Sequence, residues 1–223
     1  MNEIYRQCLT RTVRRIALLA LVLLGLTYTI ARAEDISMVD QEYTNLARSY
    51  FYHIPVHSPI GQTFTPKLSA LNVVEIWITG ASSDYHNADV QVRIRKGTID
   101  GPIIGTSSIG HVSDGYDGIV HLEFPTIIPV APGEIYVIEA LNVAGDELGV
   151  IVDEGPAKYA RGYFIVRGAA ELNKDMWFRE GLNAASPTKA EECKKDGWRN
   201  LVRKDGTTFK NQGDCIQYVK KGQ

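Results

Sequence analysis

The chain has 223 residues and a formal net charge of −2, but its charges are unevenly distributed along the sequence. Residues 34–186 contain 10 Lys and Arg against 20 Asp and Glu, whereas residues 187–223 contain 9 against 5. The acidic main region argues against nucleic acid as a partner, because binding a polyphosphate depends on basic side chains. The basic tail could contact an anionic polymer or surface, although so small an excess of charge usually serves solvation.

The first 33 residues have the three zones of a secretory signal peptide. A basic start with four arginines precedes an apolar run from Ile16 to about Ile30, and Ala31-Arg32-Ala33 forms a small-x-small cleavage site. A membrane anchor is the competing interpretation, but the run falls short of the ~20 apolar residues that a bilayer span needs. We therefore expect cleavage before Glu34 and a secreted or cell-surface location. The Arg14-Arg15 pair leaves the twin-arginine export route open beside the general secretory route.

Removal of residues 1–33 would leave one full-sized domain with a short appendage. No second apolar run approaches membrane length, so we expect no transmembrane segment in the mature chain. The composition changes near Pro187, and the pattern changes just before it. We therefore divide the mature chain into a main domain at 34–182 and a C-terminal module at 183–223.

The main domain has the pattern of many short β-strands. Residues 88–95 alternate apolar and polar side chains, which is typical of a sheet that is wet on one face. Turn-forming pairs such as Asp100-Gly101 and Pro132-Gly133 separate the candidates. The strand candidates are 62–65, 73–79, 88–95, 103–109, 119–124, 135–140, 148–152, 162–166 and 176–179. We therefore expect an all-β, jelly-roll-like antiparallel sandwich, with another Greek-key sandwich as the near alternative.

The segment before the first of these strands is harder to place. Tyr50, Phe51 and Tyr52 could form a strand, but Pro55 and Pro59 would confine it to an edge.

The C-terminal module has signals for two short helices and one disulfide. Thr188 begins a candidate capping box before Gly197, and Asn211 can start a helix that runs through Val219. Cys193 and Cys215 are the only cysteines after the predicted signal, so we expect them to pair in an oxidising compartment. The closed loop would contribute on the order of 3 kcal/mol in the chain-entropy model. The expected miniature core is Trp198, Leu201, Phe209 and Tyr218.

Several strings in the main domain resemble a family of secreted bacterial jelly-roll domains. The strings are GQTFTP at 61–66, LNVVE at 71–75, VRIR at 92–95, GPIIGT at 101–106, PGEIYVIE at 132–139 and DMWFR at 175–179. The resemblance spans roughly residues 36–181 and implies a fold and an exported location rather than an activity. Separately, residues 193–215 are similar to a short Cys…Gly-Trp…Phe-Lys-Asn-Gln-Gly-x-Cys module that recurs at the C-terminus of exported bacterial proteins.

Enzyme signatures are missing from the sequence. Residues 105–109 lack the second glycine of a nucleophile elbow, and there is no HExxH, phosphate-binding Gly-Lys loop or dinucleotide fingerprint. We therefore expect a protein without catalytic residues. Carboxylate pairs such as Asp146-Glu147 and Asp153-Glu154 leave a structural Ca²⁺ ion open, although their spacing matches no complete calcium loop.

The hypothesis for function is a binding module for a glycan or a cell-envelope polymer. A sugar site needs an exposed aromatic ring beside polar side chains, and three predicted loops offer both. The candidate ligand-binding residues are Asp84, Tyr85 and Asn87 in one loop, Asp114, Tyr116 and Asp117 in a second, and Tyr159 and Arg161 in a third. The alternatives are a structural or adhesive surface protein that acts by protein–protein contacts, and a polymer-acting hydrolase.

Overall fold

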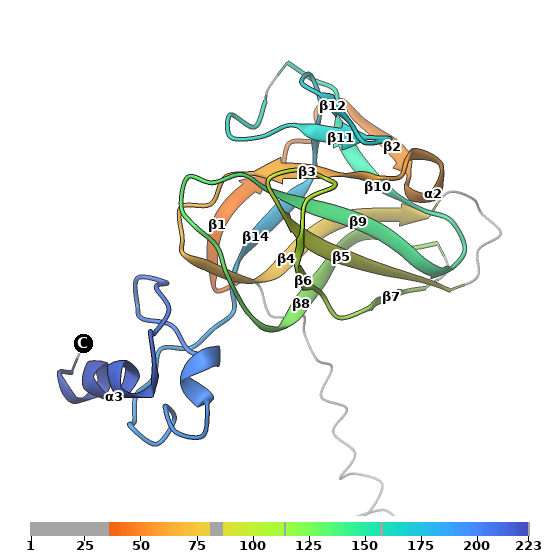
Figure 1. Cartoon of the computed structure of the whole chain (residues 1–223). Helices are drawn as coiled ribbons and strands as arrows, with labels where there is room; N and C mark the ends of the chain where they lie inside the picture. Colours follow the sequence, from red (N-terminus) through yellow and green to blue (C-terminus); the bar gives the residue numbers. More distant parts are fainter. Residues whose placement is uncertain (1–35, 81–86, 114, 157, 223) are drawn as a thin grey trace, which may run out of the picture. The chain divides into compact units, whose positions relative to one another are not determined.

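The computed structural model describes residues 36–80, 87–113, 115–156 and 158–222. Two antiparallel sheets form a sandwich, and a small module with a helix and a disulfide follows it (Figure 1). The predicted all-β sandwich with a small helical module is therefore confirmed. The predicted signal peptide lies outside the described residues.

The first sheet is built around one long strand. Strand β4 (Ala70–Gly80) pairs with β8 (Asp117–Pro129) on one side, and with β14 (Phe178–Leu182) and then β10 (Leu148–Asp153) on the other. Strand β1 (Met38–Tyr43) adds to β14, while β2 (Ser49–His53) and β13 (Asp175–Met176) pair with β10. The expected edge strand around Phe51 is thus present as β2, and Pro55 follows it in the single turn α2 (Ile54–His57).

The second sheet runs in the order β12-β11-β3-β9-β5-β6, with β7 also paired to β5. Its strands are β3 (Ile60–Phe64), β5 (Ala88–Lys96), β6 (Ile103–Thr106), β7 (Gly110–Val112), β9 (Tyr136–Gly145), β11 (Phe164–Val166) and β12 (Ala169–Glu171). The strand predicted at 103–109 is broken at Ser107, whose hydroxyl accepts a hydrogen bond from the Val92 N–H at 3.0 Å. This hydrogen bond to a side chain stands where a regular backbone hydrogen bond between the strands would otherwise form.

The core lies between the two sheets, where the alternating side chains of both meet. In β5, Val90, Val92 and Ile94 are fully buried, as their alternation predicts. Trp177 is also buried, but it is not part of this core cluster; it contacts the half-buried Trp77 edge to face at 5.9 Å. Burial of this apolar surface is the main stabilising contribution to the fold.

The most deeply buried acidic side chain in the described part of the sandwich is that of Glu180. Glu180 is fully buried on β14, and neither of its oxygens has a regular hydrogen-bond donor among the described residues. Its neighbour across the strands is the irregular part of β1, where the register shifts between Val39 and Gln41. Burial, together with the charge of Asp40, raises the pKa of Glu180 well above its ordinary value. The protonated form is therefore the one that suits this position.

The C-terminal module is closed by the predicted disulfide between Cys193 and Cys215, whose Cα atoms are 5.8 Å apart. The predicted second helix is α3 (Gln212–Lys220), and the Asn211 side chain caps it by accepting from the Asp214 N–H at 2.9 Å. Cys193, Cys215, Phe209 and Tyr218 form a buried cluster, against which the half-buried Trp198 and Leu201 pack. The expected miniature core is therefore present.

The first predicted helix of the module does not form. Residues 189–197 make successive i→i+3 turns, and the carboxylate that binds the Thr188 N–H belongs to Glu192, at 2.8 Å, rather than to Glu191. Lys195 and Asp196 adopt positive φ angles of 49° and 64°, which an α-helix does not permit. A 3₁₀ helix, η1 (Gly197–Asn200), follows them instead.

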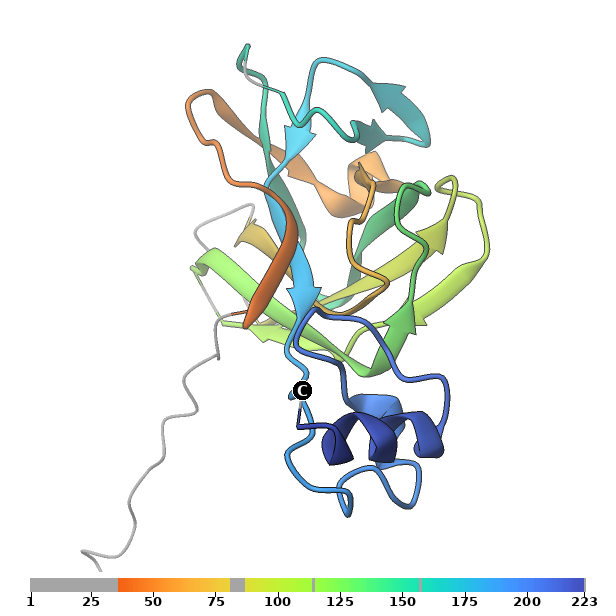
Figure 2. The same cartoon turned by 90° about the vertical axis from the view of Figure 1, so that its left-hand side faces the viewer.

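The module packs directly against the sandwich beyond the end of β14 (Figure 2). Val202 of the module is buried together with Ala70 and Leu182 of the sandwich. A Cβ added to Gly206 would lie 2.9 Å from the sulfur of Met38, which shows how closely the two parts approach. No helix in the described part of the chain is long and apolar enough to cross a membrane.

Candidate binding groove beside the C-terminal module

The strand ends that flank two of the three predicted binding loops lie at one end of the sandwich. Ala88 pairs there with both Val112 and Gly145, and Asp117 pairs with Thr79. Asn87 is exposed at this end. Asp84, Tyr85 and Asp114 were also candidates, and they lie outside the described residues.

The two described candidates of the second loop, Tyr116 and Asp117, are engaged in contacts inside the protein. The Tyr116 hydroxyl donates to the Ile119 carbonyl at 2.5 Å, and its ring packs against the sandwich core. Burial also raises the pKa of Tyr116. Asp117 accepts a hydrogen bond from the indole Nε1 of Trp77 at 2.7 Å. These contacts give Tyr116 and Asp117 structural roles.

The third predicted loop lies at the opposite end of the second sheet, beyond the strand end where Phe64 pairs with Tyr136. Tyr159 is buried there, its hydroxyl donates to Gln41 at 3.0 Å, and burial raises its pKa. Its ring is therefore part of the core rather than an exposed platform for a sugar. Arg161 is exposed, and its guanidinium lies 3.4 Å from the Thr65 carbonyl.

The buried acids of β10 and β13 organise loops. Asp153 accepts hydrogen bonds from the Tyr43 hydroxyl at 2.5 Å and from the Arg48 and Gly155 N–H groups at 3.1 and 3.0 Å. Burial raises the pKa of Asp153, but these hydrogen bonds outweigh it, so its pKa lies below the ordinary value. Among the described residues, no three His, Cys, Asp or Glu side chains gather into a group that could hold a metal ion.

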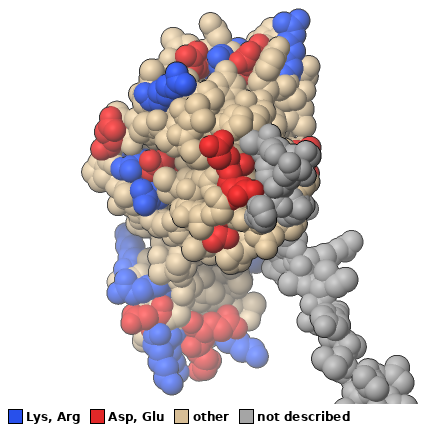
Figure 3. Space-filling view, turned by 90° about the vertical axis from the view of Figure 1, so that its right-hand side faces the viewer, with Lys and Arg blue, Asp and Glu red and all other residues tan. Residues whose placement is uncertain are grey.

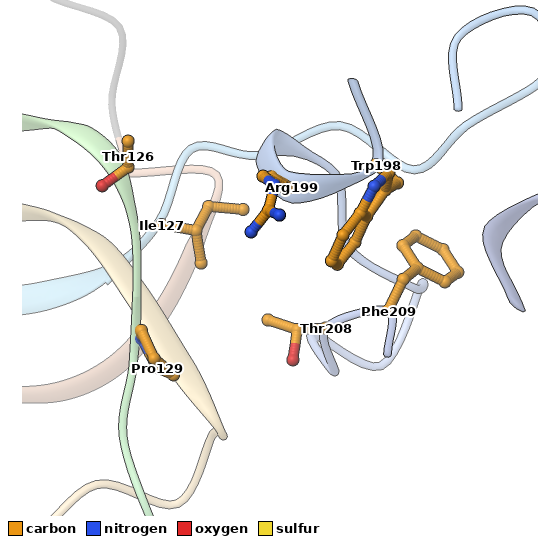
Figure 4. A pocket seen from close by; sticks show the side chains of 7 residues that line it. All are labelled: Thr126, Ile127, Pro129, Trp198, Arg199, Thr208 and Phe209. Atoms are coloured by element: carbon orange, nitrogen blue, oxygen red, sulfur yellow. The ribbon is translucent and has the colours of Figure 1, made fainter. Parts of the chain in front are cut away.

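A groove with different properties lies where the far end of β8 faces the module (Figure 4). Its volume is about 320 Å³, within the range of small-molecule sites. It is lined by Thr126, Ile127 and Pro129 of the sandwich and by Trp198, Arg199, Thr208 and Phe209 of the module. The groove thus combines two aromatic rings, two hydroxyls and one cation.

The local sequence explains how the module presents these side chains. The left-handed residues Lys195 and Asp196 end the preceding turns, and the short η1 that follows places Trp198 and Arg199 beside β8. Thr208 is held by a β-bridge to Val202, which brings the adjacent Phe209 under the groove. The disulfide ties the segment before η1 to α3, so it constrains both module walls of the groove.

Among the described residues, Arg199 is the one charged residue that lines the groove, and none of the lining residues is a carboxylate. Its guanidinium carbon lies 4.6 Å from the centre of the Trp198 ring, within cation–π range. Its Nε atom contacts Asp196 at 3.3 Å, but both side chains are largely exposed, at 63% and 75%, so this pair contributes little. The terminal N–H groups of Arg199 bind no other described residue and remain available to a ligand.

Two larger hollows offer fewer free polar groups. In one, of about 600 Å³, the Thr63 and Thr65 hydroxyls already donate to the Tyr163 and Arg161 carbonyls. In the other, of about 470 Å³, Lys158 donates to two backbone carbonyls, while Glu154 binds the Tyr52 hydroxyl at 2.5 Å and Lys174. The groove beside the module is therefore the strongest candidate site in the described part of the chain.

The sandwich and the module differ in net charge along the sequence. On the face shown in Figure 3, the sandwich carries a group of acidic side chains together with several basic ones, and the module also carries both kinds. The groove therefore lies next to the more basic part of the chain.

The sequence placed Trp198 and Phe209 in the module core, which is correct, but it did not indicate their second role. The sequence did contain one signal of a binding role: the aromatic Trp198 stands next to Arg199, just before the polar turns of the module. The facing wall from β8 could not be recognised, because Thr126 and Trp198 are far apart in sequence.

No family model and no curated protein matches this chain.

Proposed function

We propose that this protein is a non-catalytic binding module that recognises a glycan or another cell-envelope polymer through the groove between β8 and the C-terminal module. One observation carries the proposal: aromatic, hydroxyl and guanidinium groups line one groove, and the guanidinium is free to donate. Glycan recognition depends on this combination of apolar surface and directional polar groups. The buried disulfide suits an oxidising compartment outside the cytosol, where such polymers occur.

The proposal moves the site away from the loops that the sequence favoured. The polar groups of Tyr116 and Asp117 form hydrogen bonds within the protein, and Tyr159 is buried. Loops remain the usual place for function on a rigid sandwich. Here, however, the module adds a second wall that the sandwich alone does not have.

The test is binding of the purified protein to a panel of cell-envelope polysaccharides, measured by calorimetry. Trp198→Ala should weaken binding by about tenfold or more, because it removes both a wall of the groove and the ring over which the Arg199 guanidinium lies. Trp198→Phe keeps an aromatic ring in the module core and serves to separate a lost contact from unfolding.

The matched control is Asn87→Ala, which removes an exposed polar group from the loop end that the sequence favoured. It should bind like the unaltered protein. Loss of binding in Asn87→Ala with full binding in Trp198→Ala would return the site to the loops. Absence of binding to every polymer would reject the proposed function in favour of a protein-contact role.

A further inference from the structure

We infer that the groove selects an anionic polymer, through a carboxylate or phosphodiester that binds Arg199. This inference rests on the proposed function and names the ligand class for the same site. It follows from how much of the Trp198 ring is covered by its neighbours and from the charge of the residues that line the groove.

The Trp198 ring offers little free face to a neutral sugar. The ring packs against the buried cluster that contains the disulfide, and the Arg199 guanidinium lies over it at 4.6 Å. A sugar that stacked on this ring would have to displace the guanidinium. The polar surface that the pair presents is therefore the N–H edge of Arg199.

That edge has the chemistry of an anion site. A guanidinium presents N–H donors in a planar fork that matches carboxylate and phosphate oxygens, and stacking on an aromatic ring restricts its orientation. Its contact with Asp196 uses Nε alone, so the terminal nitrogens remain for a ligand. Among the described residues no carboxylate lines the groove, and the nearby Asp196 carboxylate, 3.3 Å from the Arg199 Nε, is 75% exposed, so solvent screens it from an incoming anion.

The rest of the groove suits a polymer repeat around that anion. Among the described residues, the hydroxyls of Thr126 and Thr208 have no side-chain hydrogen-bond partner within the groove. Ile127, Pro129 and Phe209 supply apolar surface opposite and beneath them. Residues 187–223 carry a net charge of +4, whereas the sandwich is acidic. A polyanion is therefore attracted to the module more strongly than to the sandwich.

The experiment compares polygalacturonate, its fully methyl-esterified form and poly(glycerol phosphate) as ligands of the purified protein. The ester has the same backbone as polygalacturonate without the charge, so it isolates the anion. We expect one of the two polyanions to bind at least about tenfold more tightly than the ester, with affinity that falls as salt is added. The arm that binds identifies carboxylate or phosphodiester as the recognised group.

Arg199→Gln is the decisive variant, because the side chain is exposed and its loss should leave the fold intact. It should remove the preference for the polyanion, whereas Arg161→Gln, an exposed arginine in another hollow, should keep it. Arg199→Lys should recover only part of the affinity, because lysine lacks the planar fork.

The two proposals fail in different ways. Equal binding of polygalacturonate and its ester, lost in Trp198→Ala but unchanged in Arg199→Gln, would overturn anion selection and leave the groove as a neutral glycan site. No binding of any of the three polymers, nor of the polysaccharide panel, would overturn both.

Discussion

The disulfide should hold the module, and with it the groove, while the sandwich folds without it. The variant to make replaces Cys193 and Cys215 by alanine together, which leaves no free thiol in residues 34–223. Cross-linking residues separated by 22 positions contributes about 3 kcal/mol in the chain-entropy model. The module core has few other buried side chains, chiefly Phe209 and Tyr218, so this is a large part of its local stability.

Hydrogen exchange measures that loss where it occurs. Amides of α3 (Gln212–Lys220) should lose protection by on the order of 100-fold, since about 1.4 kcal/mol corresponds to a factor of ten. Amides of β4 and β9 should exchange as before, because their core is separate from the module cluster. Unchanged α3 protection in the alanine variant would refute the view that the disulfide holds the module.

Two further predictions concern the sandwich. The raised pKa of Glu180 means that protonation favours the folded state, so the free energy of unfolding should fall as the pH rises from about 4.5 through that raised pKa. Glu180→Gln should flatten this dependence in urea unfolding; an unchanged slope would assign it to other groups. Gly61→Ala should cost about 3 kcal/mol, because the new Cβ would lie 2.1 Å from the Ile138 carbonyl oxygen. Thermal unfolding measures this cost, and an unshifted midpoint would contradict it.

The regular strands could be predicted from the sequence because they are wet on one face. The alternation of Val90, Val92 and Ile94 with polar residues marks β5 directly, and the cysteine count gives the disulfide. Strand β1 has no such alternation. Its register shifts between Val39 and Gln41, so a simple period of two cannot describe it.

The site could not be predicted in the same way, since it depends on contacts between distant segments. Tyr159 has the residue type and the loop position of a ligand-binding aromatic, but tertiary packing buries it against Phe178. Trp198 has the pattern of a core residue, and only the approach of β8 turns it into a groove wall. Glu180 likewise reads as an exposed strand residue until its place opposite β1 is known.

The most direct test of the binding groove is an NMR titration that follows the indole N–H signals of the three tryptophans. Trp198 lines the groove, Trp77 donates its indole N–H to Asp117 at the opposite end of β8, and Trp177 is buried. Substitution of each tryptophan by phenylalanine assigns the signals. When the polymer that binds most tightly is added, the Trp198 signal should shift and the Trp77 signal should stay. A shift of Trp77 with Trp198 unchanged would contradict the groove and place binding at the loops.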